Sequence, residues 1–396
     1  MSFYKRTVMI LLTVFLVNLV PYRVVVGEEK NSKETNVEIQ IESPAAVLME
    51  AKTGKVLFEK NMNEKRYPAS VTKIMTLLLI YEAVENGKVK WDDVVTVSEH
   101  AASMGGSQVY LEPNEQQTVK TLTKCIAVAS ANDASVAMAE HIAGSEEAFV
   151  KMMNEKAKEL GMKNTNFVNA CGLHDDAHLT SAYDIALMSR ELINKYPEIH
   201  ELTTIWTDTI THKTRRGEEE FGLTNTNNLI KWYQGANGLK TGFTSQSMYC
   251  LSGTAERDGL SLIAVVMGAK TKQARNSEVA KMFNYGFANY AIIQGDPVGK
   301  IVGSVKVYKG NAPAVDCAIK KDVKLLVSKK IANQKIESKV ELPEYVKAPV
   351  EKGMKVGEIV YLFQGKEVGR SDLVATDAVK KASLKTMLNL LLKRWY

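Results

Sequence analysis

The stretch Pro68–Lys73, with the sequence PASVTK, opens a helical pattern and carries the first of three motifs that together predict the fold and the site. Within it, Ser70 and Lys73 lie one turn apart on the same face of the predicted helix. Two more short motifs follow in order. Ser130–Asn132 reads SAN and begins 60 residues after Ser70, in an apolar helical region, and Lys240–Gly242 reads KTG in a strand-like run. The three motifs together predict one catalytic site.

These residue types suit nucleophilic catalysis. A serine hydroxyl attacks well only when a base takes its proton, and a helix start favours the negative charge that develops on Ser70. Lys73 can be that base only when neutral, and burial and a neighbouring cation, plausibly Lys240, both lower a lysine pKa. Ser130 can pass a proton to the leaving group, and Asn132 offers a donor and an acceptor to a substrate amide.

The KTG strand supplies the remaining parts of the predicted site. Lys240 and Thr241 can bind a terminal carboxylate, and Gly242 lets a substrate backbone approach closely. The backbone N–H groups of Ser70 and Phe243 form the predicted oxyanion hole. Each motif alone is weak, because Ser2–Lys5 also matches Ser-x-x-Lys and Lys52–Gly54 also reads KTG. Order, spacing and context single out the later copies.

The composition predicts an exported globular protein. The chain has 396 residues, enough for two or three domains, and its net charge of +6 is concentrated at the two ends, which disfavours a nucleic-acid binder. Residues 1–27 are predicted to be a secretory signal peptide: Lys5 and Arg6 precede the apolar stretch Thr7–Val20, which is short for a membrane span. An uncleaved anchor is the alternative.

The remaining sequence is predicted to form two domains and a tail. Residues 28–294 alternate helical and strand-like runs and carry the motifs. We expect a hairpin within residues 46–60, a helix-capping box at 181–184, strands at 239–243, 248–256 and 260–269, and a last helix at 277–290. Residues 295–378 alternate apolar and polar side chains between glycine turns, which indicates a small all-β domain. Residues 379–396 place leucines, Met387 and Trp395 on one helical stripe with basic residues opposite, as in a helix lying on an anionic membrane surface. A helix that docks on the β domain is the alternative.

The four cysteines and the His174–His178 segment are expected to have structural rather than functional roles. The four cysteines allow three pairings, and Cys125 and Cys250 lie in apolar runs typical of buried thiols. His174 and His178, with acids between them, suggest a metal, but the segment precedes a helix cap and is predicted to be a loop. We therefore expect no metal and no cofactor.

The three motifs, with GL at 172–173 and TSAYD at 180–184, closely resemble the low-molecular-mass D-alanyl-D-alanine carboxypeptidases, which are penicillin-binding enzymes. The resemblance covers about residues 42–396. It implies an α+β penicillin-binding or serine β-lactamase-like domain, with an antiparallel sheet flanked by helices, then a small all-β domain and a C-terminal amphipathic helix. It implies catalytic roles for Ser70, Lys73 and Ser130. It implies substrate-binding roles for six residues: Asn132, Lys240, Thr241, Gly242, Phe243 and Arg275.

The same resemblance implies the partners and the location. The expected partners are peptidoglycan pentapeptide stems, β-lactam antibiotics and a membrane surface reached through residues 380–396, with no nucleic acid. The expected location is the outer face of the cytoplasmic membrane. Arg275 matches an arginine that helps to hold the substrate carboxylate, with a surface arginine as the alternative. Phe243 stands where relatives often have histidine, which leaves only its backbone N–H as a predicted contribution.

Three other functions share this chemistry. A serine β-lactamase would need a glutamate followed by an asparagine to activate the deacylating water, and residues 164–169 contain no glutamate. A β-lactam sensor that stays acylated would normally need transmembrane signalling segments, and none is visible in the sequence. Transpeptidation, in which an amine takes the acyl group instead of water, stays open as a side activity.

Overall fold

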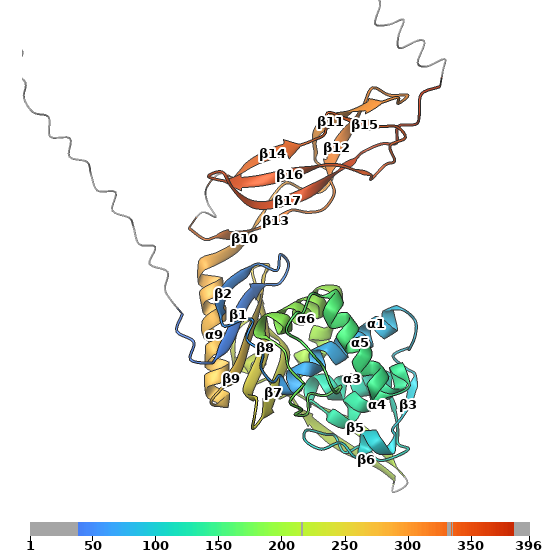
Figure 1. The fold of residues 1–396 in the computed structure, drawn as a ribbon, viewed down its shortest axis with the longest axis vertical. Coiled ribbons are helices and arrows are strands. Elements are labelled where there is room, and N and C mark those ends of the chain that lie inside the picture. The colour runs from blue at the N-terminus through green and yellow to red at the C-terminus, as the bar shows by residue number, and fades with distance from the viewer. Residues whose placement is uncertain (1–38, 215–216, 331–333, 335, 384–396) are drawn as a thin grey trace, which may run out of the picture. The chain divides into compact units, whose positions relative to one another are not determined.

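The computed structural model describes residues 39–383, except 215–216, 331–333 and 335. The predicted signal peptide therefore lies outside the described residues. The first region is built on a five-stranded antiparallel sheet in the order β2-β1-β9-β8-β7 (Figure 1). Its strands are β1 Ala45–Glu50, β2 Val56–Lys60, β7 Ala236–Thr244, β8 Met248–Arg257 and β9 Leu260–Ala269. β7, which carries the KTG motif, is an edge strand of this sheet.

Helices cover both faces of the sheet. α9 (Lys272–Asn289) packs on one face, and five longer helices lie on the other (Figure 1). These are α1 Lys73–Glu85, α3 Val119–Val128, α4 Asn132–Ala143, α5 Glu146–Glu159 and α6 Ala182–Lys195. The shorter helices are α2 Glu99–Ala102, α7 Ile199–Thr203 and α8 Leu229–Trp232. Several start at a serine or threonine that accepts a backbone N–H, such as Ser181 from Asp184.

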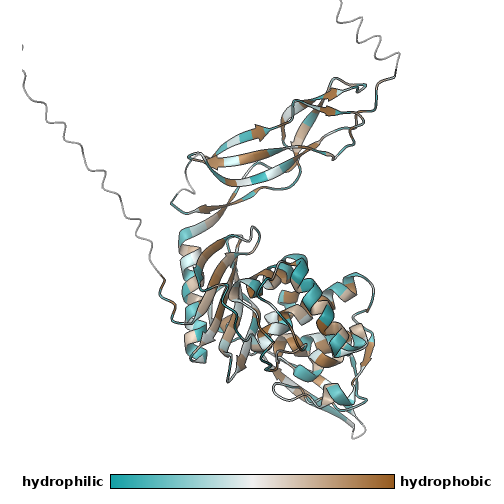
Figure 2. Ribbon diagram, in the orientation of Figure 1, coloured by the Kyte–Doolittle hydropathy of each residue, from teal (hydrophilic) through white to brown (hydrophobic). Residues whose placement is uncertain are grey.

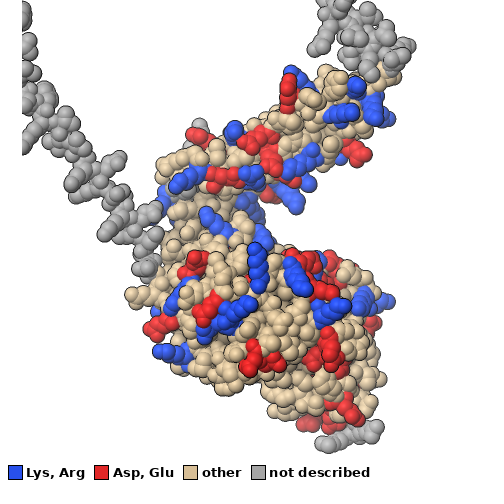
Figure 3. Space-filling model, viewed as in Figure 1, with Lys and Arg blue, Asp and Glu red and all other residues tan. Residues whose placement is uncertain are grey.

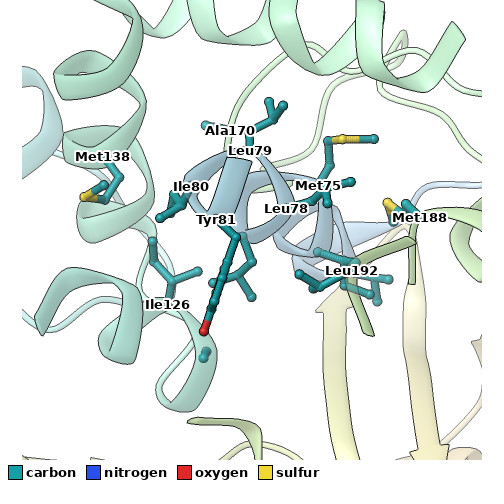
Figure 4. Packing of buried hydrophobic residues seen from close by; sticks show 14 of the residues in the cluster. Met75, Leu78, Leu79, Ile80, Tyr81, Ile126, Met138, Ala170, Met188 and Leu192 are labelled. Carbon is teal, nitrogen blue, oxygen red and sulfur yellow. The ribbon is translucent and has the colours of Figure 1, made fainter. Parts of the chain in front are cut away.

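The core centres on α1. Its residues from Lys73 to Tyr81 are all buried, and a helix that is apolar all round is expected to lie inside a protein. Met75, Leu78 and Ile80 lie in one apolar cluster with residues of α3, α4 and α6, such as Ile126, Met138 and Leu192 (Figure 4). The helices of this region carry apolar residues among polar ones (Figure 2). The consequence is that Lys73, at the start of α1, is anchored by the most buried helix of the fold.

Two small hairpins beside the helices were not predicted from the sequence. β3 (Val94–Thr96) pairs with β4 (Gln116–Thr118), and β5 (Thr207–Thr214) pairs with β6 (Gly217–Thr224). They are joined by a side chain, because Gln117 donates to the carbonyl oxygen of Thr211 at 2.9 Å. The segment between β3 and β4 contributes to the site described below.

The C-terminal region is all β. β10 (Tyr290–Gln294) follows α9 and pairs with β13 (Lys324–Ser328), and a six-stranded sheet has the order β14-β16-β17-β12-β11-β15. Its strands are β11 Ile301–Tyr308, β12 Ala314–Ile319, β14 Glu337–Glu341, β15 Tyr345–Lys347, β16 Lys355–Phe363 and β17 Lys366–Ala375. The alternating pattern of this region gives it a separate apolar core.

The predicted tail helix, 379–396, lies mostly outside the described residues. Its first residues are extended chain bonded to the β domain, not helix: Val379 pairs with Val350, and Lys381 pairs with Gly310. No helix in the described part of the chain is long and apolar enough to cross a membrane. Acidic and basic side chains are interspersed on the surface in view (Figure 3), whereas a nucleic-acid binder would need a basic stripe.

Candidate active site

Ser70 lies in a tight turn, not in the first α-helical turn as predicted. Residues Ala69–Thr72 form a 3₁₀ helix, and α1 begins at Lys73. Ala69 is 3% exposed and has a φ of 50°, in the left-handed region that a residue with a side chain rarely adopts. Such a conformation persists only where the surroundings hold it, and it is common beside active sites. The turn places Ser70 next to Lys73 and beside β7.

The Lys73 ammonium contacts three oxygen atoms. It lies 2.9 Å from Ser70 Oγ, 2.6 Å from Asn132 Oδ1 and 2.6 Å from the carbonyl oxygen of Cys171. Burial lowers the pKa of Lys73 to about 8. Because the amide and carbonyl oxygens can only accept, they hold two N–H groups in either protonation state. The third position of the amine faces Ser70, where a neutral lysine has its lone pair.

The contact from Cys171 is a part of the site that sequence reasoning missed. Asn169 holds its loop: Oδ1 of Asn169 accepts from the backbone N–H groups of Cys171, Gly172 and Leu173. At Gly172, φ is 84°, and a Cβ would lie 2.0 Å from the carbonyl oxygen of Ala69. The GL motif at 172–173 was the sequence signal, because its glycine lets this loop pack against the turn that carries Ser70.

Asn132 is held from two sides. Besides accepting from Lys73, it donates through Nδ2 to the carbonyl oxygen of Gly105 at 2.6 Å, and its backbone N–H donates to Ser107. Both ends of the amide are therefore engaged with the protein, although the sequence analysis assigned both to substrate. One N–H of Nδ2 remains for a substrate carbonyl.

Asp133 fixes the loop that holds Asn132. Its buried carboxylate accepts from the backbone N–H groups of Val109, Leu111 and Ala134 at 2.9–3.3 Å. Burial raises the pKa of Asp133, and these three donors oppose that rise. Asp133 also raises the pKa of Lys73 by attraction. Asp133 directly follows the SAN motif, and no role was predicted for it from the sequence.

Ser130 sits in the break between α3 and α4. It is 3% exposed and has a φ of 64°, again in the left-handed region. Its neighbour Asn132 opens α4 and contacts Lys73, so the turn brings the SAN motif to the Ser-x-x-Lys motif as the sequence predicted.

Lys240 is 1% exposed, although it lies on an edge strand. Burial lowers its pKa well below the ordinary value, and the nearby charges of Lys73 and Arg275 lower it further. Of the two causes expected to lower the pKa of Lys73, burial and Lys240, burial is the main one. Lys52 of the second KTG motif is exposed in the β1–β2 hairpin, away from these residues.

The rest of β7 supports the turn. Thr241 Oγ1 is 2.6 Å from Thr226 Oγ1. At Gly242, a Cβ would lie 2.7 Å from the carbonyl oxygen of Pro68 and 3.1 Å from the Ser70 nitrogen. Glycine is therefore needed for β7 to pack against the turn, a reason different from the predicted approach of substrate. Phe243 is 53% exposed, and its ring packs on Tyr249 at 4.4 Å between centroids.

Arg275 is buried, which excludes the surface alternative. It is 3% exposed and lies in the first turns of α9, which starts at Lys272, five residues before the helix predicted from Ser277. Its Nε donates to Asn276 Oδ1 at 3.0 Å, while Nη2 is buried without a hydrogen-bond partner in the described part of the chain. Burial lowers the pKa of Arg275 to about 10. An unpartnered guanidinium nitrogen inside a protein is suited to bind an anion.

The two histidines of the suspected metal site have other contacts. His178 is buried, bonds Thr72 Oγ1 through Nε2 and accepts from the backbone N–H of Val168 through Nδ1, and burial lowers its pKa to about 4. His174 packs edge-on against Tyr67. Among the described residues there is no group of three metal-ligating side chains. The four cysteines are free and buried.

Comparisons with known proteins identify the family of the chain. The family described as D-alanyl-D-alanine carboxypeptidase matches residues 29–271, and the C-terminal domain of penicillin-binding protein 5 matches residues 296–381. The chain is 44% identical to D-alanyl-D-alanine carboxypeptidase DacF of Bacillus subtilis over 93% of both chains.

Solved structures have the same fold. Penicillin-binding protein 5 from Haemophilus influenzae superposes with a TM-score of 0.76 at 32% identity, over 87% of this chain and 99% of that one. Penicillin-binding protein D2 from Listeria monocytogenes, solved in an ampicillin-bound form, superposes with a TM-score of 0.56 at 33% identity, over 63% of this chain and 99% of that one. The predicted fold class is confirmed, and the chain belongs to the serine D-alanyl-D-alanine carboxypeptidase family of penicillin-binding proteins.

Proposed function

We propose that this chain removes the terminal D-alanine from peptidoglycan stem peptides through an acyl-enzyme on Ser70. One observation carries the proposal: Lys73 Nζ lies 2.9 Å from Ser70 Oγ. Two more buried cations, Lys240 and Arg275, lie nearby, since the charges of Lys73 and Arg275 both lower the pKa of Lys240. A nucleophile with its base beside a cationic site fits a substrate that ends in a free carboxylate.

In the acylation step, the carboxylate of the last residue binds Arg275 Nη2 and the Lys240–Thr241 strand segment. The scissile carbonyl oxygen accepts from the backbone N–H groups of Ser70 and Phe243. Neutral Lys73 takes the proton from Ser70 Oγ, which attacks the carbonyl carbon. The peptide C–N bond then breaks, leaving an ester on the serine.

The leaving D-alanine needs a proton on its nitrogen. Ser130, which is buried between α3 and α4, passes that proton on from the Lys73 ammonium. Water then attacks the ester, with Lys73 again as the base, and the peptide is released with a new C-terminus. Each proton taken from a nucleophile is given to a leaving group, so the step needs no cofactor.

β-Lactams would acylate the same serine, since they present a reactive carbonyl and a carboxylate together. The relative from Listeria monocytogenes was solved with ampicillin bound, which supports this part of the proposal. The β-lactamase alternative lacks its glutamate at 164–169, and there Asn169 is used to hold the Cys171 loop. A sensor that stays acylated would show one turnover only.

The proposed location is the outer face of the cytoplasmic membrane. Residues 1–27 would direct export, and the apolar stripe with its basic residues in the tail would bind an anionic lipid surface. This arrangement would hold the enzyme near the wall without a span. These proposals rest on the sequence pattern alone.

The test is incubation with a peptide ending in two D-alanines, followed by assay of free D-alanine. We expect many turnovers per enzyme, and neither release nor a penicilloyl mass adduct from Ser70→Ala. One equivalent of product without further turnover would favour the sensor. A normal adduct on Ser70→Ala would reject the assignment of the nucleophile.

A further inference from the structure

Tyr110 is an exposed aromatic residue that the loop holds outward under strain. It is 64% exposed and has a φ of 60°. The N–H groups on either side of it, at Val109 and Leu111, both donate to Asp133, which forces the residue between them to the surface. Strained non-glycine residues persist where the surroundings impose them and often mark binding sites. Nothing in the carboxypeptidase chemistry described above uses this ring.

A pocket of about 420 Å³ lies beside Tyr110, and the β5–β6 hairpin forms its other side. Tyr110 meets Phe221 edge-on at 5.8 Å between centroids, and Phe221 meets His212 at 5.5 Å. Glu218 and Glu219 also line it. Glu219 is the direct partner of His212 in the hairpin, so the two side chains lie on the same face. The pocket therefore combines aromatic rings with carboxylates.

His212 adds a fixed, unused polar atom. Its Nδ1 is 2.9 Å from Glu115 Oε1, and this carboxylate is fully buried, so Nδ1 carries the proton. Nε2 is buried and has no hydrogen-bond partner among the described residues. The atom is closed off from solvent, so a sugar hydroxyl reaches it only when the side chains that cover it move aside. A buried polar atom without a partner calls for an explanation.

We propose that this pocket binds a sugar ring of the glycan that carries the stem peptide. A sugar ring has an apolar C–H face, which suits the Tyr110 and Phe221 rings, and hydroxyl groups at its edge, which suit His212 Nε2 and Glu219. A free peptide offers fewer hydroxyl donors for these acceptors. The inference rests on the proposed function, which supplies a glycan-linked substrate.

The length of the stem peptide is comparable to the separation of Tyr110 from the Asn132 contact. Tyr110 is three residues from Ser107, whose carbonyl oxygen accepts from Asn132 at 2.7 Å, so it lies at most about 11 Å along the chain from that contact. A pentapeptide stem cut before its last residue keeps four residues between Ser70 and the sugar. Four extended residues span up to about 14 Å.

The experiment compares kcat/KM on two substrates, the free pentapeptide and the same peptide on a glycan oligomer. Tyr110→Asn removes the ring, and asparagine tolerates positive φ, so the loop is kept. We expect roughly tenfold lower kcat/KM on the glycan-linked substrate and a change within about twofold on the free peptide. Tyr110→Phe keeps the ring and should keep the wild-type value. Tyr308→Asn, in the C-terminal domain, is the control for losing another exposed tyrosine, at 54%.

The outcomes separate the two proposals. Equal losses on both substrates, or no loss on either, would overturn the glycan site while leaving the carboxypeptidase intact. A wild-type enzyme that shows no preference for the glycan-linked substrate would overturn it as well. Failure of the wild type to hydrolyse the free peptide would instead reject the proposed function, and the glycan site with it.

Discussion

The sharpest prediction concerns the pH dependence of acylation. Burial lowers the pKa of Lys73 from 10.5 to about 8, and the base works only in its neutral form. Acylation should therefore accelerate as pH rises and level off above pH 8. Lowering the pH through this range restores the ammonium, which has no lone pair to take the Ser70 proton.

The magnitude follows from the two pKa values. At pH 7 about one Lys73 in ten would be neutral, against roughly one in three thousand for an ordinary lysine. The difference of about 300-fold corresponds to about 3.4 kcal/mol. The acylation rate should rise about ninefold from pH 6 to 7, about fivefold from pH 7 to 8, and no more than about twofold beyond.

The assay is the second-order rate constant of β-lactam acylation, measured at limiting β-lactam from pH 6 to 10. This constant reports the pKa of the free enzyme. Asp133→Asn should move the midpoint down, because the Asp133 charge raises the pKa of Lys73. Asp184→Asn, which removes another buried carboxylate, should not move it. A rate already level at pH 6, or one with a midpoint near 10.5, would refute Lys73 as the base.

Three further predictions follow from individual contacts. Lys240→Met should abolish hydrolysis yet raise the melting temperature at pH 7, because folding lowers the pKa of Lys240 and this costs free energy. The gain in melting temperature should vanish as the pH approaches 10.5. Lys52→Met should change neither hydrolysis nor the melting temperature. Gly172→Ala should slow acylation and lower the free energy of unfolding by several kcal/mol in a urea titration, because its Cβ would lie 2.0 Å from the carbonyl oxygen of Ala69. Gly161→Ala is the control: nothing lies within 4 Å of its Cβ, so it should lower the free energy of unfolding by only about 1–2 kcal/mol. Deleting residues 384–396 should release the enzyme from anionic vesicles in co-sedimentation while kcat on a small peptide is retained; the cut belongs after Ser383 because Lys381 is paired with Gly310.

The sequence was most informative where local chemistry determines structure. The β1–β2 hairpin, the three strands β7–β9 and most helix ends follow from alternation, turns and caps, and the confirmed fold class depends on them. The start of α9 was placed five residues late because Lys272–Asn276 is polar, although Arg275 and Asn276 are buried there. Periodicity detects apolar faces, and it cannot detect a polar face buried against other polar groups.

The structure brings Ser70 and Asn132 to Lys73, as the sequence led us to expect, and adds a backbone contact that the sequence did not indicate. Ser70, Lys73, Asn132 and Lys240 were found because the chemistry requires those residue types. The carbonyl oxygen of Cys171 could not be found, since every residue has one and only the loop held by Asn169 brings this one to Lys73. Contacts of this kind depend on long-range packing, which a sequence pattern does not encode.

The clustering of buried cations explains how one arrangement can serve both binding and catalysis. Burial lowers the pKa values of Lys73, Lys240 and Arg275, and this costs folding free energy. In addition, Arg275 Nη2 is buried without a hydrogen-bond partner among the described residues. In the proposed function, a substrate carboxylate would relieve this cost on binding, because it would pair with Lys240 and Arg275. The same burial keeps a fraction of Lys73 neutral before the substrate arrives. Replacing these cations with apolar residues would therefore favour folding and remove the reason for the substrate to bind.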